Sequence, residues 1–212
     1  MNSTRFVLHR LSTVALLAAT LAAPLTACAP LLLGGAVFGG TMVFVDRRTT
    51  GTQVEDQAIE IKAGLEARRA APSGHINTTS YNRRLLITGE VASEGERKAA
   101  EQAAGRVENV RLVDNELAVA GNTSISARSS DSVITAKVKA GFIDAKDLQA
   151  QAIKVVTERG IVYLMGIVTE REASRATDMA RTVAGVNKVV RVFEIVSEAE
   201  LARLIPGQSP KP

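Results

Sequence analysis

The sequence predicts an α+β protein of two tandem αββαβ units, each a three-stranded mixed sheet packed on two helices. Two observations lead to this prediction. The chain repeats itself at a spacing of 77 residues, for example residues 61–65 with 138–142 and residues 86–91 with 163–168. Each repeat also contains apolar residues at helical spacing followed by alternating segments. The strand–helix–strand part requires a right-handed crossover, which makes those two strands parallel.

The first helix of each unit is predicted from its apolar spacing. In the first unit, one stripe of apolar residues recurs with the helical period: Val54, Ala58, Ile61 and Leu65. In the second unit, we expect the helix over Asp131–Asp144. Its apolar residues should face the sheet: Ile134, Val138, Gly141 and Phe142.

A β-hairpin should follow each first helix. Residues 75–81 and 84–91 alternate well enough to be two strands joined at Asn82-Arg83, and Arg159-Gly160 occupies the same turn in the second unit. Gly89 and Gly166 fall near the end of the second strand. We interpret both as structural glycines that permit a bulge or a close backbone approach.

The second helix of each unit has a recognisable start. Residues 93–107 are predicted to form this helix in the first unit, with Ser93 as the N-cap and Glu96 three positions later. Thr169 and Glu172 repeat the pattern in the second unit. The last strands are expected over 110–119 and 186–196. A short amphipathic helix is expected over 197–205.

The N-terminus resembles a bacterial lipoprotein signal. Arg5 and Arg10 precede an uncharged apolar run over 11–23, and Leu25-Thr26-Ala27-Cys28 matches a lipobox. The alternative is an uncleaved membrane helix, but this run is short of the roughly 20 residues that a span needs. We therefore expect Cys28, the only cysteine, to become the first mature residue and to carry a diacylglyceryl group and an N-acyl (palmitate-type) chain. Ala29 after the cysteine favours the outer membrane in the lipoprotein sorting rule.

Residues 29–45 are apolar and uncharged. A membrane-spanning helix is one reading, but four glycines and Pro30 argue against a stable helix, so a lipid-proximal tether is expected. The predicted organisation is as follows: signal peptide 1–27, lipidated tether 28–48, first domain 49–121, linker 122–130, second domain 131–198 and tail 199–212.

Composition disfavours nucleic-acid binding and catalysis. Once residues 1–27 and their two arginines are removed, 24 Lys and Arg stand against 22 Asp and Glu, a net charge of about +2 with no clustered basic patch. His75 is the only histidine of the mature chain, and no second nitrogen or sulfur ligand for zinc accompanies it. We expect no enzyme, no catalytic residue, no metal and no cofactor beyond the lipid on Cys28.

The repeated αββαβ unit, the Leu-Thr-Gly and Leu-Met-Gly strand ends and the Val-x-x-Val before each last strand resemble the BON domain family. Two such units behind a lipobox resemble the outer-membrane lipoproteins of this family. The segment over residues 46–56 adds to this resemblance, with the sequence Asp-Arg-Arg-Thr-Thr-Gly-Thr-Gln-Val-Glu-Asp. The resemblance implies a lipid-anchored protein of the outer membrane that faces the periplasm and supports envelope integrity. It also implies that the second domain binds anionic phospholipid of the inner leaflet.

The residues themselves suggest where lipid binds. Val133 lies off the core-facing stripe of the second domain's first helix, beside Lys137 and Ala140, while Lys139 and Arg128 add positive charge. An apolar side chain beside an ammonium suits the boundary between acyl chains and phosphates. The alternative is a solvated helix face with a stray valine, and relatives often carry an aromatic residue where this chain has Val133.

A second function stays open. The chain could be a protein adaptor for envelope assembly or for regulation of cell division and cell-wall hydrolases. An exposed sheet edge could then accept a strand from the partner.

Overall fold

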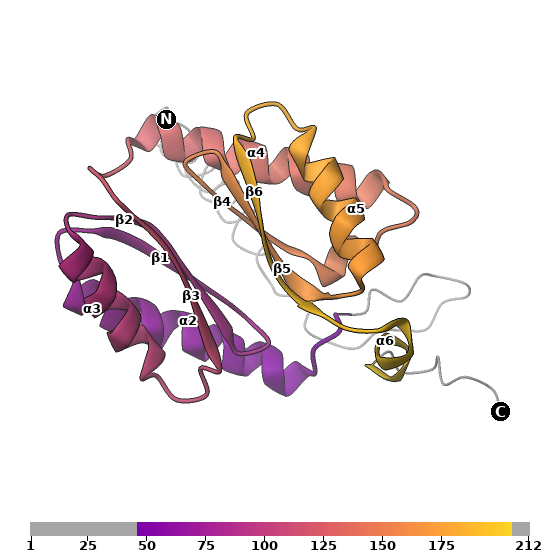
Figure 1. The fold of residues 1–212 in the computed structure, drawn as a ribbon, viewed down its shortest axis with the longest axis horizontal. Helices are drawn as coiled ribbons and strands as arrows, with labels where there is room; N and C mark the ends of the chain where they lie inside the picture. The colour runs from indigo at the N-terminus through magenta and orange to yellow at the C-terminus, as the bar shows by residue number, and fades with distance from the viewer. Residues whose placement is uncertain (1–45, 205–212) are drawn as a thin grey trace, which may run out of the picture. The chain divides into compact units, whose positions relative to one another are not determined.

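The computed structural model describes residues 46–204 of the chain. Cys28, the signal peptide, residues 29–45 of the expected tether and residues 205–212 lie outside this range. The described part contains two copies of the predicted αββαβ unit, which confirms the α+β fold. In Figure 1, each sheet carries its two helices on one face.

The elements follow one another in the predicted order. The first copy has α2 (Thr50–Ala70), β1 (His75–Tyr81), β2 (Arg84–Val91), α3 (Glu94–Gly105) and β3 (Leu112–Val119). The second copy has α4 (Ile125–Asp144), a 3₁₀ turn (Ala150–Ala152), β4 (Lys154–Glu158), β5 (Ile161–Val168), α5 (Glu170–Arg181) and β6 (Lys188–Ile195). A short helix, α6 (Glu198–Leu204), follows.

Each sheet has its second strand in the centre. β2 pairs antiparallel with β1 and parallel with β3, and β5 pairs in the same way with β4 and β6. The parallel pair is the one that the crossover helix joins, as predicted from handedness.

The hairpin turns are held by buried aspartates on the preceding helices. Both turn residues have positive φ in each copy: 52° and 65° at Asn82 and Arg83, 56° and 72° at Arg159 and Gly160. Positive φ at both central residues is the type I′ turn, whose backbone twist matches the right-handed twist of the two strands that it joins. The Asp56 carboxylate accepts from the backbone N–H groups of Asn82 and Arg83, at 2.8 and 2.7 Å. Asp131 of α4 does the same for the second turn, at 2.8 Å each.

The positions of these aspartates show that the predicted spacing of 77 residues between the two copies does not hold for their first helices. Asp56 and Asp131 are 75 positions apart, whereas the turns that they hold are 77 apart. The second copy therefore has two extra residues between helix and hairpin, in the connection that contains the 3₁₀ turn. Ile61 and Val138 match in sequence but not in structure, since Ile61 is 71% exposed and Val138 only 1%.

The core-facing positions of the two helices follow the 75-residue spacing. Ile59, Ala63 and Ala67 on α2 correspond to Ile134, Val138 and Phe142 on α4, and all six are buried. The expected inward positions of Ile134, Val138 and Phe142 on α4 are thus confirmed, whereas Gly141 is only half-buried. The apolar stripe of α2 points away from the core. Small residues line α2 where it packs on Ala100 and Ala104 of α3, because closely approaching helices leave little room for side chains.

A third apolar cluster covers the sheet faces that carry no helices. It joins residues of both copies: Tyr81, Leu86, Tyr163, Met165, Ile167 and Val192. β2 and β5 are buried on both faces for this reason. The sequence predicted that helices cover each sheet on one face only, so the packing of the two copies through their other sheet faces is a correction.

The helix starts follow their caps. The Ser93 hydroxyl accepts from the backbone N–H of Glu96, and Thr169 with Glu172 forms the complete capping box. Helix α4 begins six residues before the expected Asp131, because Ser124 caps it by accepting from the N–H of Ala127. Most of the expected linker over 122–130 is therefore helix.

The two strand glycines lie where another backbone passes closely. A Cβ at Gly89, whose φ is +116°, would lie 1.9 Å from the carbonyl oxygen of His75. At Gly166 it would lie 2.3 Å from the carbonyl oxygen of Ala152. Both positions exclude any side chain unless the backbone shifts.

Candidate lipid-contact site

The outward face of α4 carries most of the residues that the sequence suggested. Val133, Lys137, Lys139 and Ala140 are all exposed, opposite the buried Ile134 and Val138. At 3.6 residues per turn, Lys137 and Lys139 lie about 160° apart around the helix, so they flank the apolar residues from two sides. The helix thus presents apolar side chains between two ammonium groups.

Two isoleucines that were not predicted from the sequence extend this face. Ile125 is 81% exposed at the N-terminal end of α4, and Ile143 is 69% exposed at its C-terminal end. Ala136 is exposed between them. Ser124 as N-cap was the signal that would have placed Ile125 on the helix, and the spacing from Ala136 and Ala140 would have placed Ile143. We call Ile125, Val133, Ala136, Lys137, Lys139, Ala140 and Ile143 the α4 outward face.

Arg128 does not join the α4 outward face. It is half-buried and lines a polar cavity of about 300 Å³ together with His75, Asp131 and Glu158. Burial raises the pKa of the Glu158 carboxyl, although a hydrogen bond from Asn77 opposes the shift. The Arg128 Nε has no hydrogen-bond partner among the described residues. Its charge therefore faces this cavity and not the α4 outward face.

A small hollow lies at the C-terminal end of the α4 outward face. It has a volume of about 230 Å³, and Lys139, Phe142, Ile143 and Ile153 contribute to its lining. Ala150 and Gln151 complete the lining, so the hollow combines apolar walls with one ammonium and one amide group.

The segment that leads into α2 is clamped to both copies. The side chain of Arg47 is only 3% exposed. Its guanidinium donates to both carboxylate oxygens of Glu172, at 2.7 and 2.9 Å, and to the carbonyl oxygen of Ile167 at 2.6 Å. Arg48 pairs with Asp46 and with Asp56, each at 2.8 Å, and its guanidinium lies 4.1 Å from the centre of the Tyr81 ring. Residues 46–48, which we call the clamp, were expected to be tether. They are instead fixed by these ion pairs.

The clamp shifts the acidity of its carboxylates. Burial disfavours the charged form of Glu172, but hydrogen bonds from Arg47 and from the backbone of Thr169 outweigh it and hold the pKa below its usual range. Burial likewise opposes ionisation of Asp56, and hydrogen bonds from Ser80, Arg83, Arg48 and Asn82 lower its pKa on balance.

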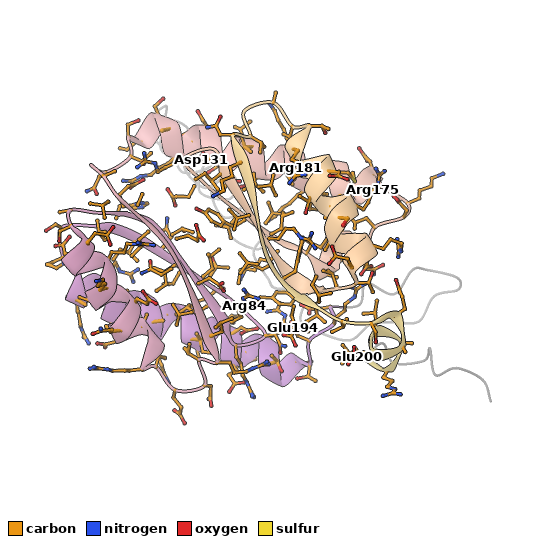
Figure 2. All side chains as sticks on the ribbon, viewed as in Figure 1. Arg84, Asp131, Arg175, Arg181, Glu194 and Glu200 are labelled. Carbon is orange, nitrogen blue, oxygen red and sulfur yellow. The ribbon has the colours of Figure 1, made fainter. Side chains whose placement is uncertain are left out.

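Further polar contacts join the two sheets. Arg84, labelled in Figure 2, donates from Nη1 to the carbonyl oxygen of Phe193 at 2.9 Å. Asn82 donates to Glu194 at 2.8 Å, and Lys154 pairs with Glu60. The second copy is thereby held to the first by apolar, ionic and hydrogen-bonded contacts together.

Within residues 46–204, no three His, Cys, Asp or Glu side chains gather so that they could hold a metal ion. His75 lies beside Glu90, with Nδ1 3.6 Å from Oε2. No helix of this same range is long and apolar enough to cross a membrane.

The repeated fold and its sequence define the family. The family model described as BON domain matches residues 53–121 and 130–197, so the chain belongs to the BON domain family and carries two copies of the domain.

Relatives resemble the chain over most of its length. It is 37% identical to the outer membrane lipoprotein DolP of Haemophilus influenzae over 174 residues, which cover 80% of this chain and 89% of that protein. It is 32% identical to the 21 kDa hemolysin of Actinobacillus pleuropneumoniae (72% and 80% covered). It is 28% identical to the osmotically-inducible protein Y of Escherichia coli (71% and 77% covered). None of these three names describes an enzyme.

Proposed function

We propose that this protein is a non-enzymatic outer-membrane lipoprotein, anchored through lipid on Cys28 and facing the periplasm, that binds anionic phospholipid with its second BON domain. In doing so it supports the integrity of the envelope. Three findings support the proposal: the lipobox, the similarity to an outer membrane lipoprotein and the exposed α4 outward face.

The α4 outward face is the observation on which lipid binding depends. Ile125, Val133 and Ile143 can enter the acyl boundary while Lys137 and Lys139 meet phosphates. Each lysine near an anionic surface contributes about 1 kcal/mol. Such binding is weak by itself, but the anchor would keep the domain near the bilayer at a high effective concentration.

The test uses the mature chain with Cys28→Ser, which cannot be acylated. Its binding is measured by sedimentation with vesicles of phosphatidylethanolamine, with and without phosphatidylglycerol. We expect binding to the anionic vesicles only, and about a tenfold loss on Lys137→Glu, since reversal of one charge removes attraction and adds repulsion.

The matched control is Lys98→Glu, which changes the same charge at an exposed lysine of α3. It should leave binding unchanged. Equal binding to both kinds of vesicle, or equal losses for the two variants, would contradict the proposal.

A further inference from the structure

Helix α2 of the first BON domain exposes a continuous apolar stripe. Val54 is 63% exposed, Ile61 71% and Leu65 45%, and Ala58 lies exposed between them. Monomeric proteins seldom leave such a row of branched side chains in water, and a contiguous patch marks a contact with a protein or a membrane. We call these four residues and Lys62 the α2 outward face.

Four of the five residues of the α2 outward face have counterparts in the α4 outward face, and the fifth, Val54, matches Ser129. At the 75-residue spacing, Ala58 matches Val133, Ile61 matches Ala136 and Leu65 matches Ala140. The lysines correspond as well, because Lys62 matches Lys137, and both are exposed beside the stripe. The first domain thus presents a similar row, with larger apolar side chains at Ile61 and Leu65, a smaller one at Ala58 and no counterpart of Lys139, which matches Gly64.

The charge of α2 favours an anionic partner. Its most exposed charged residues are Lys62, Arg68 and Arg69, while among its acids Glu66 has a side chain that is 43% exposed. Each acid on α2 is already paired with a basic side chain: Glu55 with Arg83, Asp56 with Arg48, Glu60 with Lys154 and Glu66 with Arg69. Arg69 is taken up by Glu66, so Lys62 and Arg68 are the cations of α2 that remain for a negative surface, and Arg68 also donates to the carbonyl oxygen of Ile76 at 3.3 Å.

From these observations we infer that the α2 outward face is a second contact for an anionic lipid bilayer. Ile61 and Leu65 would enter the boundary between acyl chains and headgroups, while Lys62 and Arg68 would meet phosphates. Helix α2 starts 22 positions after Cys28, so an anchor there would hold this face within reach of the bilayer. The inference does not require that α4 binds lipid.

Site-specific labelling tests the contact directly. Cys28 is the only cysteine of the chain, so Cys28→Ser gives a background in which one new cysteine is labelled unambiguously. An environment-sensitive fluorophore is attached to the full mature chain at Ile61→Cys, at Val133→Cys or at the control Lys98→Cys. Vesicles of phosphatidylethanolamine with phosphatidylglycerol should shift the emission of the Ile61→Cys label to the blue, and lipid-borne quenchers should reduce it. The Lys98→Cys label should stay unchanged.

Binding measurements with unlabelled variants give an independent readout. Because the helices of the two copies lie on opposite outer sides of the packed sheets, one molecule contacts a bilayer with one outward face at a time. The α2 contact is therefore measured in the Cys28→Ser, Lys137→Glu chain, where Ile61→Ser and Leu65→Ser together should lower partition into anionic vesicles at least about fivefold. Leu112→Ser, at a half-exposed leucine at the start of β3, is the matched control and should have no effect.

The outcomes separate the two lipid contacts. A blue shift at Val133→Cys without one at Ile61→Cys would overturn this inference and leave the proposed function standing. A blue shift at Ile61→Cys without one at Val133→Cys would support this inference and contradict lipid binding by α4. If Ile61→Ser instead abolishes a concentration-dependent dimer without vesicles and leaves vesicle binding intact, the α2 outward face is a contact between copies of the chain and the inference is wrong.

Discussion

The Arg47 guanidinium and the Glu172 carboxylate form a buried two-point ion pair, with nitrogen–oxygen distances of 2.7 and 2.9 Å across 125 positions of sequence. Glu172 also accepts from the backbone N–H of Thr169 and so belongs to the capping box of α5. One carboxylate therefore starts a helix of the second domain and holds the segment that enters the first.

Arg47→Ala should destabilise the protein strongly. It leaves the Glu172 charge buried without its partner, and loss of one member of a buried pair costs about 3–5 kcal/mol. Urea denaturation at neutral pH measures the loss. Arg69→Ala, which removes the exposed pair with Glu66, is the control and should change the free energy of unfolding by less than about 1 kcal/mol. Similar effects for the two variants would mean that the clamp contributes little.

Stability should fall as the pH drops through the acidic range. The pKa values of Glu172 and Asp56 are held below their ordinary values of 4.5 and 3.8, so the ionised carboxylates stabilise the fold at pH values above these. This stabilisation is lost as the pH falls from the pKa of each carboxyl in the unfolded chain through its lower pKa in the folded protein. Urea unfolding across this range should show a smaller acid-induced loss for Glu172→Gln than for the wild type. An identical pH profile for both proteins would contradict this.

Glu158 should behave in the opposite way. Its pKa is raised, first by burial and also by the nearby charges of Glu90 and Asp131. The protonated carboxyl therefore adds to the free energy of unfolding at pH values below the pKa of the unfolded chain, and this stabilisation is lost as the pH rises through the pKa of the folded protein. Glu158→Gln keeps an oxygen that can accept from Asn77 and removes the charge. It should therefore stabilise the protein at neutral pH and have little effect near pH 4, as thermal unfolding at the two pH values will show. Destabilisation at both would contradict the prediction.

Gly89→Ala should destabilise the first domain by more than about 1 kcal/mol. Residue 89 has a positive φ, which strains any residue other than glycine. The added Cβ would also meet the carbonyl oxygen of His75, so β1 and β2 would have to separate locally. Gly121→Ala is the control, because a Cβ there meets nothing within 4 Å. Denaturant titration of both variants makes the comparison, and equal stabilities would rule out the close approach at Gly89.

The processed N-terminus should start at an acylated Cys28. Mass spectrometry of the protein from membranes should find a terminal peptide whose mass includes a diacylglyceryl group and one further acyl chain. Cys28→Ser should prevent this acylation and release the protein from the outer-membrane fraction. An unmodified Cys28 in the native protein would overturn the anchor.

Local features were predictable because their causes are local. The hairpin at Asn82-Arg83, the caps at Ser93 and Thr169 and the strand bounds around them follow from residues within a few positions. On α4, the exposed position of Val133 and Lys137 also followed from helical period. Arg128 was placed wrongly because a cavity built from β1, β4 and α4, and not the helix alone, decides which way its charge faces.

The sequence by itself determined the repeated αββαβ unit, its turns and caps, and the lipobox, since these depend on period and on neighbouring residues. Only the tertiary structure decided which side of α2 is inside. Its core positions are Ala63 and Ala67, because α3 packs closely there, so the larger apolar residues lie outside. The sheet-to-sheet packing and the Arg47–Glu172 pair likewise needed the fold, because they join residues that only a folded chain brings together.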